Sequence, residues 1–197
     1  MNALKILLGS AFFIGIMLFL IGMFVAPKHF NITRTTTIDT PAETIYPYVS
    51  SLEAMDKWSP WAEMDPNMTN TFDGTSGAVG SVNKWDSTVE DVGAGSQTIT
   101  SIEPNKLVQM RLDLKRPYER TNTAAVRLKP NVKNTETKVT WSVRGEYTFM
   151  EGLFMMFQDL EAELGPKLEE GLASLKTQVE QDNTIMSSKD KMPANAN

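Results

Sequence analysis

Hydrophobic and polar residues alternate along much of the chain between residues 67 and 148, as in half-buried β-strands. The clearest alternation is in residues 106–115, where the apolar positions are Val108, Met110, Leu112 and Leu114. The expected strands cover residues 68–74, 80–87, 96–104, 106–115, 121–129 and 137–148. Because short turns separate them, they predict an antiparallel meander with one face in water.

A further strand and a short helix are expected before this meander. Residues 31–40 are rich in Thr and Ile and predict a strand. Thr40 can cap a helix that begins at Pro41 and runs to about residue 52, with Glu43 completing a capping box. A second short turn follows, and Ser59-Pro60 ends it.

A long amphipathic helix is expected from about residue 152 to 180. Its apolar residues recur three or four positions apart: Leu153, Phe157, Leu160, Leu164, Leu168, Leu172, Leu175 and Val179. Gly165-Pro166 interrupts this stripe and predicts a kink or a restart. Met150, Met155 and Met156 could line an adaptable apolar site, but core filling is the favoured interpretation.

This order of elements predicts an α+β fold. The long C-terminal helix would lie across the concave face of a curved antiparallel sheet of about seven strands, and the short helices would close one end. A single helix covering a sheet tends to leave space between the two layers.

The first segment predicts a membrane anchor. Residues 6–26 carry no charge and are long enough to cross a bilayer as a helix. Bulky Phe24 and the following Pro27 make a poor signal-peptidase site after Ala26, so an uncleaved span is favoured over a signal peptide. With few residues ahead of the span, we expect the amino terminus inside and the domain outside. Gly22 and Ala26 have small-xxx-small spacing, which is too common to predict a dimer.

These patterns divide the chain into three parts. Residues 1–28 form the predicted anchor, residues 29–181 the folded domain, and residues 182–197 a tail without periodicity, expected to be disordered.

Composition excludes several functions. The chain has 19 Lys+Arg against 24 Asp+Glu and a net charge of −5, which argues against a nucleic-acid partner. It has no cysteine, and its single histidine, His29, is expected at the membrane interface. Thiol chemistry, most zinc sites and histidine-based triads are therefore excluded, and no metal or cofactor is expected.

Several segments together resemble a known group of proteins. They are IDTPAETIYPYV, WSPWAEMDPNM, the Gly-rich turn before SQTITSIEPNKLV, TKVTWSVRGE and LGPKLEEGLASLK. Their order is similar to that of the helix-grip superfamily, which includes START-type and birch-pollen-allergen-like domains. Within it, the chain resembles bacterial membrane-anchored members of the polyketide cyclase/dehydrase and lipid-transport (SRPBCC) family. The resemblance implies a helix-grip fold with a cavity for hydrophobic ligands, and it supplies no shared catalytic residue.

The candidate ligand contacts are mostly aromatic or apolar. They are Trp58, Trp61, Trp85, Met110, Leu112, Trp141, Val143 and Phe157. Wedging the short helices to the sheet is the favoured alternative for Trp58 and Trp61, whereas Trp141 fits a pocket wall and plain core equally well. Glu63 and Asp65 are two apart in an irregular segment, so turn formation is favoured over a catalytic pair.

Three functions are compatible with these residues. The leading hypothesis is a membrane-tethered binding domain for a hydrophobic small molecule or lipid. A cyclase or dehydratase using the same cavity is a second, although it would need a buried acid or base and the inward strand positions look apolar. The third is a protein-interaction module like the helix-grip relatives that activate chaperones, which would show an exposed apolar patch.

Overall fold

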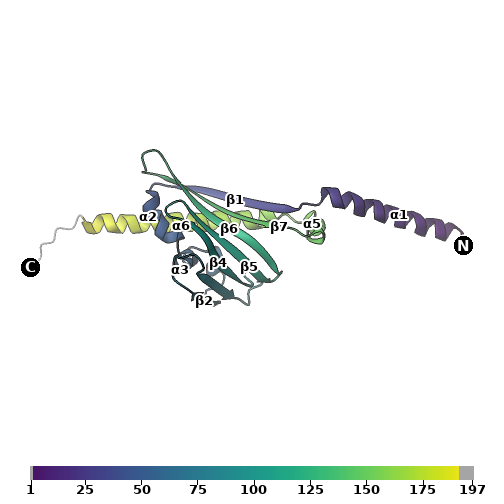
Figure 1. Ribbon diagram of the computed structural model, residues 1–197, viewed down its shortest axis with the longest axis horizontal. Helices are drawn as coiled ribbons and strands as arrows, with labels where there is room; N and C mark the ends of the chain where they lie inside the picture. The colour runs from purple at the N-terminus through teal and green to yellow at the C-terminus, as the bar shows by residue number, and fades with distance from the viewer. Residues whose placement is uncertain (1, 191–197) are drawn as a thin grey trace, which may run out of the picture. The chain divides into compact units, whose positions relative to one another are not determined.

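A computed structural model describes the backbone of residues 2–190 and most of their side chains (Figure 1). The chain forms two compact units, which we describe separately. The smaller contains residues 1–30 and 146–160, and the larger contains residues 31–145 and 161–197.

The larger unit is built on one antiparallel sheet of seven strands in the order β1-β7-β6-β5-β4-β3-β2. The strands are β1 (His29–Ile38), β2 (Thr69–Asp73), β3 (Val82–Asp86), β4 (Ala94–Glu103), β5 (Leu107–Arg116), β6 (Arg120–Pro130) and β7 (Thr137–Glu146). Consecutive strands from β2 to β7 pair with each other, so the predicted meander is confirmed. The first strand joins this sheet beside β7.

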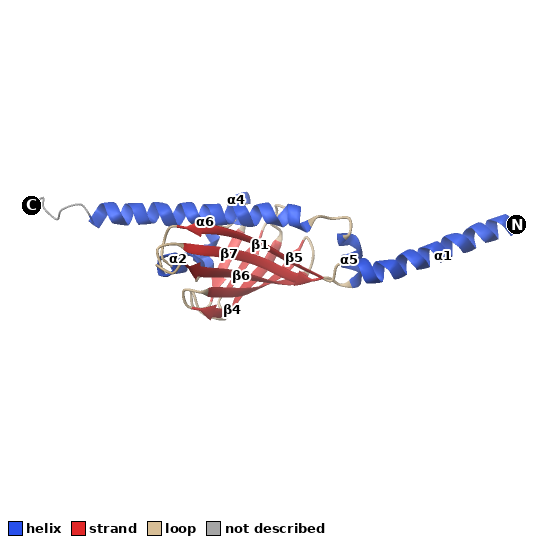
Figure 2. Cartoon of the chain, turned by 90° about the horizontal axis from the view of Figure 1, so that it is seen from above, coloured by secondary structure: helices blue, strands red, loops and turns tan. Residues whose placement is uncertain are grey.

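Helix α6 (Leu160–Asp190) runs across one face of this sheet (Figure 2). Four residues of the predicted stripe are almost fully buried: Leu168, Leu172, Leu175 and Val179. The inward side chains of β5, β6 and β7 include Val108, Val126 and Val139, each 0% exposed. The α+β helix-grip architecture is therefore confirmed.

Three short helices adjoin the sheet: α2 (Ala42–Val49), α3 (Leu52–Asp56) and α4 (Pro60–Met64). Ile45 and Val49 of α2 are buried. The preceding helix ends at Asp56, and Pro60 provides the first residue of α4. The segment between residues 50 and 65 is thus mostly helical.

The predicted capping box before α2 is wrong. Pro41 is the N-cap residue and no side chain caps this helix. The Thr40 hydroxyl accepts a hydrogen bond from Asn183 Nδ2 instead, at 3.0 Å, and Glu43 accepts one from Asn134. Tertiary contacts therefore take both side chains, and the bond from Asn134 lowers the pKa of Glu43.

The C-terminal helix differs from its prediction at both ends. Its sequence is divided into α5 (Phe149–Met155) and α6, and the break lies at residues 156–159 rather than at Pro166, which is inside α6. The helix also continues to Asp190, into the segment expected to be a tail; residues 191–197 lie outside the described part of the chain. Tyr48 Oη donates a 2.8 Å hydrogen bond to Asp182, and burial together with this bond raises the Tyr48 pKa to about 12.

The smaller unit contains helices α1 (Asn2–Val25) and α5. Within the described part of the chain, no helix combines the length and apolarity needed to cross a bilayer, so the predicted transmembrane helix is not confirmed. The expected core role of the methionines is wrong for two of them, because Met150 is 68% exposed and Met156 44% exposed.

Truncating Leu168 or Leu172 tests the packing of α6. Each side chain is at most 2% exposed, so we expect Leu168→Ala and Leu172→Ala to lower the free energy of unfolding by about 2–5 kcal/mol, the usual range for core Leu truncation. Chemical denaturation measures the change. The matched control is Gln181→Ala on the exposed side of the same helix, for which the change should stay below about 0.5 kcal/mol. Equal effects at the buried and exposed positions would contradict this packing.

Candidate functional site

Three tryptophans form a cluster on the helix-covered face of the larger unit. Trp141 lies on β7 opposite Val126 of β6, and cross-strand partners share a face of the sheet. The Trp58 ring packs edge-on against Trp141 with ring centroids 5.0 Å apart, and Trp61 does the same at 5.9 Å. Trp58 and Trp141 are buried, while Trp61 is half-buried. The structure thus brings three of the predicted contact residues together.

Trp141 also sits directly against the backbone of α6. A Cβ atom added at Gly171 would lie 2.6 Å from Trp141 Cζ3 and 3.1 Å from Pro60 Cδ, closer than van der Waals contact allows. Glycine at this position therefore lets the indole and α4 approach the helix. The approach encloses Trp141 between three elements: β7, α4 and α6.

The indole nitrogens of two of these tryptophans differ in their hydrogen bonding. Trp58 Nε1 donates to the carbonyl oxygen of Tyr48 at 2.8 Å. Trp141 Nε1 is buried and has no hydrogen-bond partner among the described residues. A buried unpaired donor is costly, by about 1–3 kcal/mol, and native structures contain few of them. Trp141 Nε1 is therefore a buried donor that the described part of the chain leaves unpaired.

The remaining inward positions nearby are both apolar and polar. Met110 and Val143 are buried, and Leu112 is half-buried. Asn122 pairs with Leu112 on the same face, and its Oδ1 is buried and without a partner among the described residues. Gln97, opposite Leu112 on β4, directs Nε2 to Met110 Sδ at 2.7 Å.

A polar network lies at the β2–β3 end of the sheet. Asn70 Nδ2 donates to Asp56 Oδ1 at 2.8 Å, and Asn83 Nδ2 donates to Asn70 Oδ1. Burial raises the Asp56 pKa, and the hydrogen bond from Asn70 partly opposes this. A carboxyl with a raised pKa can exchange protons closer to neutral pH than an ordinary Asp.

Sequence analysis missed these polar inward positions. It treated the inward face as apolar because the pattern of residues 106–115 is apolar. The register shows that Asn83, Gln97, Leu112 and Asn122 form one cross-strand row. The signal was present as amides at inward positions of the neighbouring strands, but only the register reveals which amides share a row.

Two predicted contact residues lie elsewhere. Trp85 packs over Gly95, and its Nε1 donates to the Val92 carbonyl at 3.2 Å, so its polar atom is already used. Phe157 belongs to the smaller unit and is 85% exposed, because the chain leaves the helix at residues 156–159. Asp65 has a turn role, since its Oδ1 accepts the Asn67 amide at 3.0 Å.

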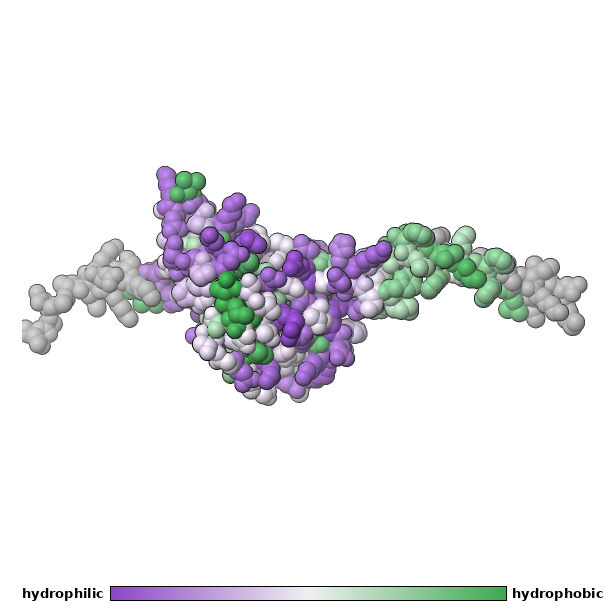
Figure 3. Space-filling view, in the orientation of Figure 1, coloured by the Kyte–Doolittle hydropathy of each residue, from purple (hydrophilic) through white to green (hydrophobic). Residues whose placement is uncertain are grey.

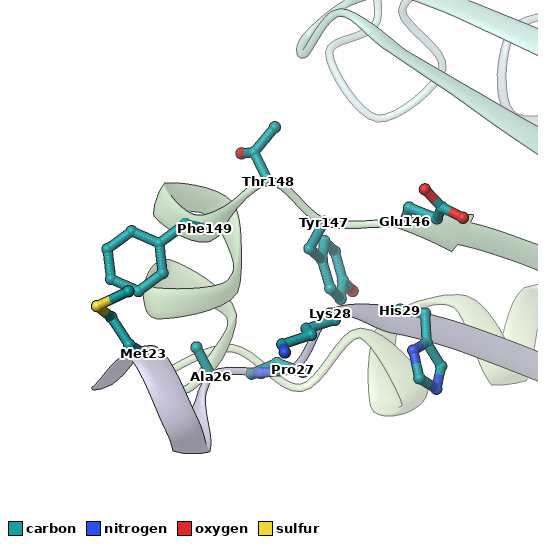
Figure 4. Close-up of a pocket in the computed structure, with 9 residues that line it drawn as sticks. All are labelled: Met23, Ala26, Pro27, Lys28, His29, Glu146, Tyr147, Thr148 and Phe149. Atoms are coloured by element: carbon teal, nitrogen blue, oxygen red, sulfur yellow. The ribbon is translucent and has the colours of Figure 1, made fainter. Parts of the chain in front are cut away.

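A pocket of about 480 Å³ lies within the smaller unit (Figure 4). Apolar, polar and charged residues line it: Met23, Ala26, Pro27, Lys28, His29, Glu146, Tyr147, Thr148 and Phe149. In Figure 4, Phe149 and Met23 point toward each other, whereas Glu146 points away from them. Sequence analysis discussed Ala26, Pro27 and His29 of this lining, none of them as a ligand contact.

The family follows from a match over most of the chain. Residues 29–180 match the model of the family described as polyketide cyclase/dehydrase and lipid transport. The chain belongs to this family. The match begins after α1 and covers the sheet, the short helices and most of α6, so all three clustered tryptophans lie in the family domain.

Solved structures share the fold of this family member at low sequence identity. A protein from Thermobifida fusca aligns with a TM-score of 0.58 and 15% identity, over 77% of this chain and 93% of that one. The Aha1 dimer from Colwellia psychrerythraea aligns with a TM-score of 0.52 and 22% identity, over 76% and 96%. Ara h 8.0201 aligns with a TM-score of 0.53 and 10% identity, over 78% and 99%. No curated protein sequence matches the chain.

Adding one methyl group at Gly171 tests the contact with Trp141. Ala is the better helix former by about 1 kcal/mol, but overpacking a core costs about 1–3 kcal/mol. We therefore expect Gly171→Ala to lower the free energy of unfolding and to shift the tryptophan emission spectrum. Denaturation and fluorescence measure the two effects.

Gly165→Ala in the same helix is the matched control. Its added Cβ meets only the guanidinium end of Arg34, a flexible side chain whose carboxylate partners, Glu161 and Glu169, are exposed. We expect stability and emission to stay near those of the parent protein. A Gly171→Ala protein that is more stable than the parent would show that Trp141 does not pack tightly on α6.

Proposed function

We propose that this protein binds a hydrophobic small molecule or lipid at the helix-covered face of the sheet, beside Trp141. The observation that carries the proposal is the buried Trp141 Nε1, which has no hydrogen-bond partner among the described residues. The family description, which includes lipid transport, supports the same class of ligand.

The surroundings of Trp141 favour an amphiphile over a pure hydrocarbon. Two neighbouring indoles and the buried Val143 offer apolar contact, worth about 25 cal/mol per Å² of apolar surface buried. The indole N–H adds one donor for a carboxylate, ester or ketone oxygen of the ligand. Asn122 Oδ1, two rows further along the sheet, offers an acceptor to a hydroxyl group.

The same proposal includes a membrane tether. The uncharged segment of residues 6–26 supports it, and so does the exposure of apolar side chains on α1, including Phe12 at 68% and Phe24 at 88% (Figure 3). The tether would hold the binding domain near a bilayer that supplies or receives the ligand. The resemblance to bacterial anchored proteins favours a bacterial inner membrane, and the orientation expected from the sequence would place the domain on its periplasmic side.

A second candidate function is acid–base catalysis of the cyclase or dehydratase type. Asp56 supports it, because burial raises its pKa and Asn70 holds one carboxylate oxygen in place. A dehydration would lower the mass of a ligand recovered after incubation by that of one water, and a cyclisation would change its NMR spectrum, whereas a carrier returns the ligand unaltered. Asp56→Asn would abolish such a change and leave binding intact.

Ligand binding is tested by removing the Trp141 donor alone. Trp141→Phe keeps an aromatic ring but lacks Nε1, so the affinity for a fatty acid or other acceptor-bearing amphiphile should fall about 2–10-fold, the worth of one hydrogen bond. Displacement of a fluorescent fatty acid from the full-length protein measures the change. Affinity for a hydrocarbon of similar length should change little.

Trp85→Phe provides the matched control. The Trp85 Nε1 atom already donates to Val92, so its loss should leave both affinities unchanged. If fatty acids, phospholipids and isoprenoids all fail to displace the probe from the parent protein, the ligand proposal is wrong. If Trp141→Phe binds the acceptor-bearing ligand as tightly as the parent, the role of Nε1 is wrong.

The tether is tested by fractionation. We expect the full-length protein to stay with membranes through an alkaline carbonate wash, because the sequence of residues 6–26 is uncharged and has the length of a membrane-spanning segment. Inserting two lysines between Phe13 and Ile14 should release it, since a charge at the bilayer centre costs about 2.5–3.5 kcal/mol. Release of the parent protein by the wash would contradict the tether.

A further inference from the structure

We propose that helix α5 is a second membrane-contacting element, which lies in the interface of the leaflet beside the end of α1. This inference rests on the tether proposed above. It concerns a surface that the family match and the ligand proposal leave unexplained, namely the exposed apolar side chains of residues 149–157.

The contacts between α1 and α5 fix the level of α5 along α1. Phe149 packs edge-on against Phe19, with ring centroids 5.1 Å apart. A Cβ added at Gly22 would lie 2.6 Å from Leu153 Cδ2, and one at Gly152 would lie 2.5 Å from the Pro27 carbonyl oxygen. Helix α5 therefore packs beside residues 19–27, the last two turns of the apolar run.

Small residues make this close packing possible. Gly22, Ala26 and Gly152 are all buried. The small-xxx-small pair of α1, Gly22 and Ala26, thus packs against α5 of the same chain. In lipid, such close backbone approach is a main source of helix association, because apolar side chains gain nothing by leaving the acyl chains.

The side of α5 that does not pack on α1 is apolar and exposed, and so is Phe157 in the turn that follows α5. Met150 is 68% exposed, Phe154 53% and Phe157 85%. The acidic residue in the helix, Glu151, is held at its N-terminus in a capping box, where its Oε2 accepts from the Thr148 amide at 2.7 Å. The capping box thereby gives backbone N–H groups at the start of α5 hydrogen-bond acceptors within the protein. A helix end needs such acceptors where little water is present.

The charged residues mark the water side of this unit. Lys28 and His29 follow α1 directly and are exposed, and Glu146 precedes α5. The Tyr147 amide donates to the Lys28 carbonyl oxygen at 2.8 Å, which brings these two chain segments to one level. Tyr147 also stacks with Phe30, with centroids 5.3 Å apart. A tyrosine and a lysine at this level are typical of the headgroup region.

A bilayer therefore fits this surface as its occupant. If residues 6–26 lie in hydrocarbon, contacts to Phe19 and Gly22 place α5 at the edge of the same hydrocarbon. Its exposed Phe and Met side chains would then contact acyl chains, whereas Lys28 and Glu146 would stay in the headgroups.

Single-cysteine labelling tests the proposal, since the chain has no cysteine of its own. Full-length Phe157→Cys, Met150→Cys, Phe13→Cys and Val132→Cys proteins would carry an environment-sensitive fluorophore in phosphatidylcholine nanodiscs. Phe13 reports on the tether, and Val132, 106% exposed in the β6–β7 turn, is the matched apolar control in water. Doxyl groups placed shallow or deep in the acyl chains quench labels according to depth.

We expect the labels at residues 150 and 157 to be quenched by shallow doxyl lipid at least about twofold more than the label at Val132. The label at Phe13 should be quenched more by deep doxyl lipid. Adding Phe154→Ser and Phe157→Ser should reduce the quenching of the label in the Met150→Cys protein. The same two changes should leave the quenching in the Phe13→Cys protein unaltered. These exposed positions can change without loss of the fold.

Other results would overturn the inference. Quenching at Phe13 but not at 150 or 157 would reject the role of α5 and leave the tether standing. Quenching at none of the positions would reject both. A label at 157 that becomes shielded from water but is not quenched by doxyl lipid would show that a protein surface, such as a second copy of the chain, covers α5 instead.

Discussion

The contact between Trp141 and the backbone of α6 at Gly171 sets the distance between helix and sheet. Any side chain at this position would push the helix away from both β7 and α4, because Trp141 and Pro60 meet it at the same point. The burial of Leu168 and Leu172 on either side depends on this approach. A cluster of large aromatic rings can thus lie under the helix only because the helix presents its smallest residue there.

Much of the fold could be predicted because the local hydrophobic pattern agrees with the burial of the same residues in the folded structure. Apolar and polar residues alternate in β5 from Val108 to Leu114, so its inward residues, including Met110, could be identified from sequence. The buried half of the α6 stripe was equally clear at Leu168 and Leu172. Where a side chain had a choice of partners, prediction failed. Thr40 and Glu43 fit a capping box, but distant residues of the folded chain take both side chains.

The candidate site was harder to predict than the fold. Trp58, Trp61 and Trp141 were identified, yet sequence could not show that one of them keeps an unpaired donor, because this depends on which carbonyl groups lie within reach. The row of amides ending at Asn122 was missed, since it is defined by cross-strand register. Phe157 was misplaced because its spacing fits a helix that in fact breaks at that point.

The bonds at the far end of α6 change where this domain can be cut. Asp182 accepts the Tyr48 hydroxyl and Asn183 donates to Thr40, so both residues belong to the folded body although they lie beyond the segment matched by the family. A chain shortened to residue 181 would leave two part-buried polar groups of the α2 region without their partners. An excised domain that is to keep its native helix-to-sheet geometry should therefore extend at least one turn past Asn183.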